Sequence, residues 1–546
     1  MVTLAIGGCE NSLVLLSPGE GKRWNPLEFS VNRVRWCLNK GNSGSRFSLT
    51  PLPLVYAVKI SFKTKLVVFM ASSRCIFWFR NDLRVSDNPA LFAAAQIGEV
   101  LPVFVLPDAE NTLGAASKWW LYHALNDLNE HLGNRLILFR GDAAKTICDL
   151  AEEQEVSAVF WNRCYEPIPI AQERSITRNL EQRGIEANSF NGSALWEPWE
   201  VLKGDGSPYK VFTPFFRRGC LSRPLPDEPA GEISTIKLSD VVESAASVSL
   251  EDMNLLPSED WDSGLRERWD VSEAGAHRAL NEFLENKLSG YSSGRDFPSR
   301  HASSNLSPYI SWGLISVHRI YERLSQKMRK SEDELYDDTF LSQLGWRGFA
   351  QSLLYHFPDL PEVNMQRKFD SFPWIDDESN FDAWKMGQTG FPFVDAAMRE
   401  LWETGFMHNR LRMVAGSFLV KNLLIDWRRG RDWFWDCLVD ADLANNSMGW
   451  QWVSGCGVDA APYFRVFNPV TQGRKFDSDG TYTCRFVPEL QKLPLEYLFN
   501  PWEAPAEVLE EAEVVLGIDY PEPIVDLAES RNRALEAYAM IRGQEK

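Results

Sequence analysis

The sequence lacks the cysteine and histidine patterns that hold metal ions. Its nine cysteines are scattered, with no C-x-x-C and no paired Cys/His spacing, and its seven histidines show no ligand spacing. We therefore predict no metal site. Unpaired cysteines favour a reducing, intracellular compartment over an oxidising one. No run of about 18 apolar residues occurs, so a membrane span is not expected.

The chain also lacks a G-x-G-x-x-G turn after its first expected strand, a repeat of fixed period, and an excess of basic residues. The missing turn removes support for an ordinary dinucleotide-binding domain. The net charge is −18, and because the first 69 residues carry +6, the rest of the chain carries −24. So acidic a body does not favour long contacts with nucleic acid, although a local basic patch remains compatible with it.

Length and composition predict a globular protein of two or three domains. Residues 1–70 are basic and poor in acids, which allows two interpretations: a transit peptide for a plastid or mitochondrion, or a misannotated start with Met70 as the first residue. Without targeting, the protein would belong in the cytoplasm or nucleus. Residues 201–270, rich in Pro, Gly, Ser and acids, are expected to form a connector that crosses the surface between domains at 71–200 and 271–546.

The first of these domains shows an alternation of strand and helix patterns. Short apolar runs rich in β-branched and aromatic residues occupy residues 75–80, 100–106, 136–141 and 158–163. Helical patterns lie between them at residues 88–96, 115–132 and 143–154. This alternation predicts an α/β domain with a doubly wound parallel sheet that ends near Phe190. Beyond Glu273 the pattern is helical almost to the end, which predicts an all-α domain.

Residues 427–468 combine five tryptophans with two acids, Asp440 and Asp442, and two amides, Asn445 and Asn446. Aromatic side chains of this size bury about 150–250 Å² each, so a solvent-facing role for all five is not expected. Two interpretations follow: a tryptophan-rich helical core, or a site for a flat molecule with polar edges.

Several motifs resemble those of the photolyase/cryptochrome family. They are FWFRNDLRVSDNPAL at residues 77–91, SNLSPYISWG at 304–313, LGWRGF at 344–349, TGFPFVDAAMREL at 389–401 and GFMHNRLRMV at 405–414. The resemblance covers residues 74 to about 542 and is greatest to microbial cyclobutane-dimer photolyases, with plant-like cryptochromes next. It implies a monomeric blue-light flavoprotein whose all-α C-terminal domain binds FAD.

The family pattern implies which residues hold the flavin. Asp440 and Arg412 match a pair beside the isoalloxazine ring, Asp442 matches an acceptor at the flavin edge, and Asn446 matches the residue that faces flavin N5. Arg347 adds a positively charged donor at the diphosphate, and hydroxyl groups and backbone N–H groups suit such an anion. The positions that match the diphosphate site are Tyr291, Ser303, Ser304, Leu306 and Ser307.

The resemblance also assigns a route for electrons and a pocket for the DNA lesion. Trp450, Trp427 and Trp374 match a tryptophan chain from the flavin to the surface, which a flavin that changes redox state requires. The lesion pocket would have two aromatic walls and a floor that accept a flipped-out pyrimidine dimer. The walls match Trp346 and Trp452, and the floor matches Asn409, Arg410 and Met413, of which Asn409 also borders the cofactor.

Two residues depart from the pattern of cyclobutane-dimer photolyases. Gln343 replaces a glutamate that hydrogen-bonds the dimer, and an amide can neither ionise nor give up a proton. Gly348 replaces an acid and costs helix stability, about 0.5–1 kcal/mol relative to Ala. These departures leave two functions open: light-driven repair of pyrimidine dimers in DNA, or a cryptochrome-like photoreceptor that acts on an unknown signalling protein.

Other features of the sequence bear on this choice and on a second cofactor. The intact pocket favours repair, as does the short end after Arg542, because plant cryptochromes usually carry a long tail. Gln343 and the acidic body favour the receptor. Family members often hold an antenna chromophore, a folate or a deazaflavin, between the domains. Asn162, Arg163 and Glu166 are candidates to border that cleft.

Overall fold

A computed structural model of the chain describes residues 73–108, 113–223, 236–239, 246–328 and 338–542, together with six short strands before residue 73. The chain divides into two compact units, Met1–Ser73 and Arg74–Lys546. In the first unit the strands form three antiparallel pairs. They are β1 (Leu4–Ile6) with β2 (Leu13–Leu15), β3 (Phe29–Val31) with β4 (Val34–Trp36), and β5 (Val58–Ile60) with β6 (Thr64–Leu66). The rest of the expected extension lies outside the described residues.

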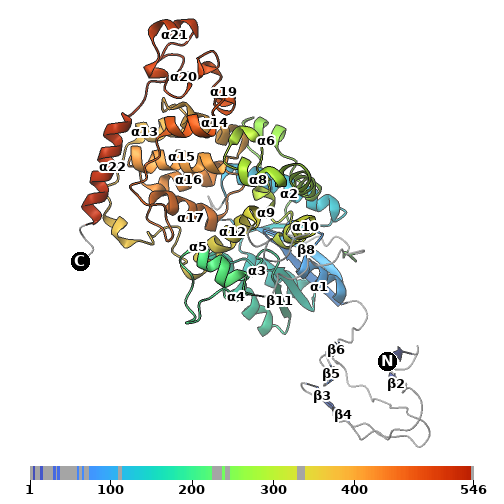
Figure 1. The fold of residues 1–546 in the computed structure, drawn as a ribbon. Helices are drawn as coiled ribbons and strands as arrows, with labels where there is room; N and C mark the ends of the chain where they lie inside the picture. Colours follow the sequence, from blue (N-terminus) through green and yellow to red (C-terminus); the bar gives the residue numbers. More distant parts are fainter. Residues whose placement is uncertain are drawn as a thin grey trace, which may run out of the picture. The chain divides into compact units, whose positions relative to one another are not determined.

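The second unit begins with a five-stranded sheet in the order β11-β10-β7-β8-β9, in which β11 with β10, β10 with β7, and β8 with β9 pair in parallel (Figure 1). The expected doubly wound sheet is therefore confirmed. Its strands are β7 (Ser73–Phe79), β8 (Gly98–Leu106), β9 (Ile137–Arg140), β10 (Ala158–Asn162) and β11 (Glu186–Phe190). The helices that connect them are α1 (Pro89–Ile97), α2 (Ala115–His131), α3 (Ala143–Glu153) and α4 (Pro167–Gln182).

Both faces of this sheet are buried, which explains its unbroken apolar runs. Along β7, Cys75, Phe77 and Phe79 belong to one core cluster, which includes residues of α1 and α2. The intervening Ile76 and Trp78 belong to another, which includes residues of α3 and α4. Alternate side chains of a strand point to opposite faces, so the two helix pairs cover opposite faces of the sheet.

The remainder of the second unit is helical, as expected. Its helices are α6 (Ser263–Arg268), α7 (Glu273–Glu282), α8 (Leu288–Gly294), α9 (Ser307–Ser311), α10 (Val317–Met328), α12 (Thr339–His356), α13 (Glu378–Lys385), α14 (Pro392–Thr404), α15 (Asn409–Ser417), α16 (Trp427–Cys437), α17 (Leu443–Ser454), α18 (Pro469–Phe476), α19 (Thr481–Phe486), α20 (Leu495–Leu498), α21 (Ala506–Glu511) and α22 (Leu527–Arg542). Among the described residues, no helix is both long enough and apolar enough to cross a membrane.

The expected connector, residues 201–270, differs from the prediction of a surface crossing. It contains α5 (Phe212–Pro214) and the π-helix η1 (Phe215–Cys220). Phe212, Phe215 and Phe216 are buried in the same core cluster as the sheet and α12. The sequence did not predict the burial of these phenylalanines, because turn-forming residues surround them on both sides.

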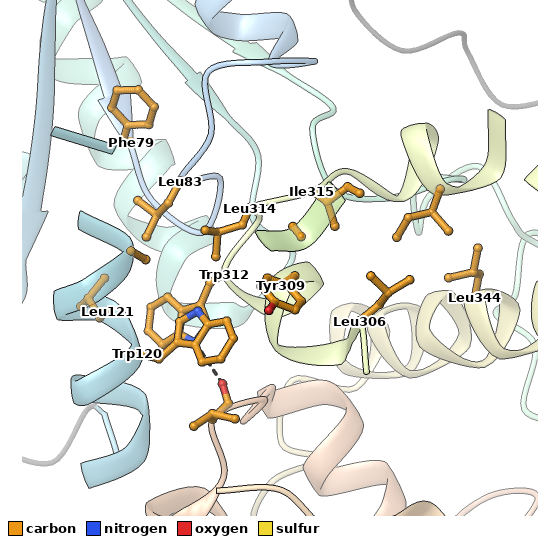
Figure 2. Packing of buried hydrophobic residues seen from close by; sticks show 14 of the residues in the cluster. Phe79, Leu83, Trp120, Leu121, Leu306, Tyr309, Trp312, Leu314, Ile315 and Leu344 are labelled. Atoms are coloured by element: carbon orange, nitrogen blue, oxygen red, sulfur yellow. Dashed lines mark hydrogen bonds between the residues drawn. The ribbon is translucent and has the colours of Figure 1, made fainter. Parts of the chain in front are cut away.

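A shared core joins the sheet to the helical part of this unit. Trp120 and Leu121 of α2 belong to one buried cluster with Leu83, Trp312 and Leu314 (Figure 2). The indole of Trp312 donates a hydrogen bond of 3.2 Å to the backbone oxygen of Val439. The α/β and helical parts therefore share one core cluster, in addition to a cluster that belongs to each part alone.

The loop after β7 fastens the two parts together with polar contacts. Arg84 is 2% exposed and donates hydrogen bonds to the backbone oxygens of Gly313 (2.9 Å) and Gly192 (3.0 Å). Glu273 accepts from the backbone N–H groups of Val85 (2.8 Å) and Ser86 (3.0 Å). Much of the FWFRNDLRVSDNPAL motif thus serves to join the domains.

Candidate functional site

The stretch of residues 427–468 forms two packed helices, α16 and α17, which begin at aspartate caps. The side chain of Asp426 accepts from the backbone N–H of Arg428, and that of Asp442 accepts from the backbone N–H of Asn445 at 2.8 Å. An aspartate at this position satisfies N–H groups that have no partner in the helix. The caps fix where Asn446 and Trp450 lie along α17.

Asp440 and Arg412 form a two-pronged ion pair. One guanidinium nitrogen of Arg412 lies 2.8 Å and 3.0 Å from the two carboxylate oxygens of Asp440, which is 8% exposed. The Nε of Arg412 donates to the backbone oxygen of Met407 at 2.8 Å. Charge-assisted bonds of this kind hold both groups in a defined orientation. The structure therefore brings together the pair that the sequence predicted.

A second ion pair joins Arg347 of α12 to Asp442 at 3.0 Å. The Nε of Arg347 is buried without a hydrogen-bond partner in the described structure. Glu166, from the α/β domain, lies close enough to interact with both charges. Burial first and the charge of Asp442 second raise the pKa of Glu166, and Arg347 and Arg80 oppose the rise, so the pKa lies at about 7. Acids and arginines from both domains therefore meet here.

The segment predicted to hold the diphosphate is rich in donors. Ser303, Ser304 and Ser307 are partly buried, and Leu306 is buried. The backbone N–H of Leu306 faces the Ser304 hydroxyl at 3.4 Å, a long contact. Tyr291 lies on α8 and packs against Phe340 of α12. The donor set fits a flavin diphosphate, and the partnerless Nε of Arg347 is a buried donor of the kind that an anion would engage.

The three tryptophans of the expected chain are held by different contacts. Trp450 is 3% exposed and packs on the backbone of α16 at Gly430, where an added Cβ would lie 2.1 Å from the indole Cη2. Trp427 lies three residues before Gly430, on the same face of α16. It is fully buried and donates to Asn364 Oδ1 at 2.9 Å. Trp374 is partly exposed, and its ring lies 4.4 Å from that of Phe372.

The predicted flavin-facing amide, Asn446, lies one turn before Trp450 and is partly buried. Its Nδ2 donates to the backbone oxygen of Arg431 at 3.0 Å. This bond commits the nitrogen of the amide to α16 and leaves its oxygen as the end that can face a ligand.

The expected lesion pocket is lined from three helices. The Trp346 ring on α12 stacks on Phe212, with centroids 3.8 Å apart and planes inclined by 9°. Trp452 on α17 is partly buried. On α15, Asn409 is exposed, and Arg410 contacts the sulfur of Met413 at 4.0 Å. Helices α12 and α15 both pack against α17, so the helices that carry these side chains are neighbours.

Two residues that were not anticipated hold the pocket. Arg295 donates to Gln343 Oε1 at 3.0 Å, and its neighbour Asp296 pairs with Arg410 at 2.9 Å. The amide nitrogen of Gln343 donates to the backbone oxygen of Thr339 at 3.2 Å. The adjacent charged residues Arg295 and Asp296, between two helices, were the available sequence signal. Sequence spacing alone does not predict that Arg295 contacts Gln343, 48 residues away. At Gly348, an added Cβ would meet nothing within 4 Å, so the glycine leaves open space.

Comparison with known proteins gives this geometry a context. Residues 340–540 match the model of the FAD binding domain of DNA photolyase, and residues 75–231 match the DNA photolyase model. A deoxyribodipyrimidine photo-lyase of Agrobacterium fabrum is 44% identical over 86% of this chain and 98% of its own length. Cryptochrome-2 of Arabidopsis thaliana is 36% identical over 86% of this chain and 79% of its own.

Solved structures agree with these relatives. A bacterial class III photolyase from Agrobacterium tumefaciens has a TM-score of 0.82 and 43% identity, over 89% of this chain and 100% of that one. An archaeal photolyase from Sulfolobus tokodaii with two FAD molecules has a TM-score of 0.70 and 29% identity, over 86% and 100% of the two chains. The chain therefore belongs to the photolyase/cryptochrome family of FAD-binding proteins.

Proposed function

We propose that the protein repairs pyrimidine dimers in DNA by light-driven electron transfer. The observation that carries this proposal is the packing of α12 and α15 against α17: these helices carry the expected pocket residues Trp346, Trp452, Asn409, Arg410 and Met413, and α12 and α15 also carry Arg347 and Arg412 of the two ion pairs. A relative that is 44% identical and named a deoxyribodipyrimidine photo-lyase supports the same function.

The chain's own residues would divide the work as follows. Bound FAD supplies a blue-light-driven one-electron donor. The ion pair of Arg412 and Asp440 orients the ring edge, while Arg347 and the serine segment hold the diphosphate. Trp346 and Trp452 stack against the flipped bases and exclude water. Trp450, Trp427 and Trp374 carry electrons inward from the surface to reduce the cofactor.

A repair assay tests this proposal directly. Photoreduced protein is illuminated with blue light on dimer-containing DNA, and the remaining dimers are counted. We expect wild type to remove dimers and Trp346→Ala to bind the damaged DNA roughly 5- to 150-fold more weakly, because a stacked base contributes about 1–3 kcal/mol. The matched control is Trp402→Ala, since Trp402 is 55% exposed on α14, outside the pocket. Persistence of dimers with wild-type protein would refute the proposal.

A second candidate function, a blue-light receptor, is favoured by Gln343. The amide cannot supply a proton, and Arg295 already occupies its oxygen. Cryptochrome-2 of Arabidopsis thaliana is also a relative. If this is the function, wild type should repair no dimers but form a long-lived reduced flavin state in light. Trp450→Phe should abolish that state.

We also propose that a second chromophore binds near Glu166 and Arg163. Arg163 contacts Glu197 at 2.8 Å and lies over the Trp199 ring at 5.7 Å, and Trp199 is 40% exposed. A partly exposed aromatic face beside buried charges suits a planar heterocycle. Absorption and fluorescence of the purified protein would reveal a bound folate or deazaflavin. Loss of that signal in Trp199→Ala, with the FAD spectrum retained, is the expected result; an unchanged signal would exclude this location.

A further inference from the structure

A buried carboxylate lies near Arg412 of the predicted flavin-site pair, on a helix that supplies none of the residues assigned above. Glu400 of α14 is 6% exposed. Its carboxylate accepts a hydrogen bond of 2.8 Å from the hydroxyl of Tyr482 on α19, which is 4% exposed. It also accepts a weaker bond of 3.5 Å from the backbone N–H of His408. A buried charge so far from solvent needs partners of this kind.

Positive charge around Glu400 comes from two arginines. Burial raises the pKa of Glu400, and the Tyr482 hydrogen bond, followed by Arg268 and Arg412, opposes the rise. Both guanidinium groups lie against the ring of Phe406, at 5.1 Å for Arg268 and 5.5 Å for Arg412. Arg412 is thus paired with Asp440 and close enough to Glu400 for their charges to interact.

The same carboxylate fixes the start of α15. His408 is the N-cap of this helix, where its Nδ1 accepts from the backbone N–H of Arg410 at 3.2 Å. Because Glu400 holds the backbone N–H of His408, it contributes to where α15 begins. Asn409 and Arg412 follow on α15, so their positions depend on that start.

We propose that Glu400 is a positioning residue that places Arg412 and balances its charge, and thereby lowers the reduction potential of the bound flavin. This inference rests on the flavin position proposed above. Reduction adds negative charge to the flavin, and a fixed anion behind Arg412 opposes that addition. Glu400 thus keeps the reduced cofactor a strong electron donor.

The test is the midpoint potential of the bound flavin, measured by spectroscopic titration without DNA. Glu400→Gln keeps the shape of the side chain and removes its charge. We expect it to favour the reduced flavin on the order of tenfold, which is about 30 mV for a two-electron couple. Tyr482→Phe is the matched control: it removes the hydrogen bond but keeps the carboxylate charge, so its potential should shift less than that of Glu400→Gln.

Arg268→Gln supplies the opposite charge change and guards against a purely structural explanation. It should lower the potential, and the double variant Glu400→Gln/Arg268→Gln should return close to wild type, because the local charge balance is restored. General damage to the fold would add in the double variant rather than cancel. If Glu400→Gln alone loses its flavin, recovery of a wild-type potential in the double variant still supports the inference.

Two results would overturn the inference while leaving the proposed function intact. One is a folded, flavin-bound Glu400→Gln with the wild-type potential; the other is a double variant that departs from wild type further than either single variant. A wild-type protein that binds no flavin would instead overturn the proposed function itself.

Discussion

The contact between Trp450 and Gly430 leads to a sharp prediction for Gly430→Ala. The added methyl carbon would lie 2.1 Å from Cη2 and 2.5 Å from Cζ3 of the Trp450 indole, and 2.7 Å from a methyl of Leu419. The rigid indole must move. Overpacking of this kind costs about 1–3 kcal/mol, and a contact this short belongs at the upper end. Replacing a helix-interior glycine returns about 0.5–1 kcal/mol. We expect a net loss of about 2 kcal/mol in the free energy of unfolding.

Urea denaturation measures this loss, and flash photolysis measures its effect on electron transfer. The matched control is Gly449→Ala: Gly449 also lies in a helix, directly before Trp450, but an added Cβ there meets nothing within 4 Å. The control should gain about 0.5–1 kcal/mol and reduce its flavin at the wild-type rate. Gly430→Ala should reduce it more slowly, because Trp450 is displaced. Equal stability and equal photoreduction in the two variants would refute the reasoning.

Three further predictions concern single side chains. Burial lowers the pKa of His408 from 6.5 to about 4. Between pH 6.5 and 4 the unfolded chain binds a proton that the folded His408 does not. The free energy of unfolding is therefore unaffected by this group above pH 6.5 and falls by roughly 3 kcal/mol as the pH drops toward 4. His408→Gln should flatten the fall in urea midpoint over that range, and a fall as steep as in wild type would contradict the assignment. Asn364→Ala leaves the Trp427 N–H buried without its acceptor, so the free energy of unfolding should drop by about 1–3 kcal/mol; an unchanged urea midpoint would argue against this bond. Gln343→Glu restores the carboxylate usual in cyclobutane-dimer photolyases and should raise dimer repair per absorbed photon, whereas an unchanged yield would exclude Gln343 as the limiting residue.

The sheet was accessible from the sequence because each central strand is an apolar run bounded by polar residues. Cys75 to Phe79 needed no knowledge of its neighbours to be assigned as a buried strand. The ion pair of Arg412 and Asp440 was accessible only through the family resemblance, since no local rule brings together residues 28 positions apart. The stack of Phe212 on Trp346 was missed because turn-forming residues surround Phe212 and hide its burial.

Longer-range contacts set the limit of the sequence-based prediction. Arg295 reaches Gln343 across 48 residues, and Glu400 of α14 meets Tyr482 of α19 across 82 residues. Both contacts depend on how helices pack, which hydrophobic periodicity does not specify. Apart from the pair of Arg412 and Asp440, which the family resemblance supplied, the charged residues of the site were therefore predicted without their partners.

The core shared by β7, α2 and the turn at Trp312 couples thermal unfolding of the sheet to release of the flavin. Because one core cluster contains residues of β7, of α2 and of the helical part, unfolding of the sheet would expose apolar side chains of both parts. Melting the sheet should remove the support beneath Trp312 and Val439, next to Asp440. The visible absorbance of the flavin would then report the unfolding of the sheet, although the assigned flavin-site residues lie outside its strands.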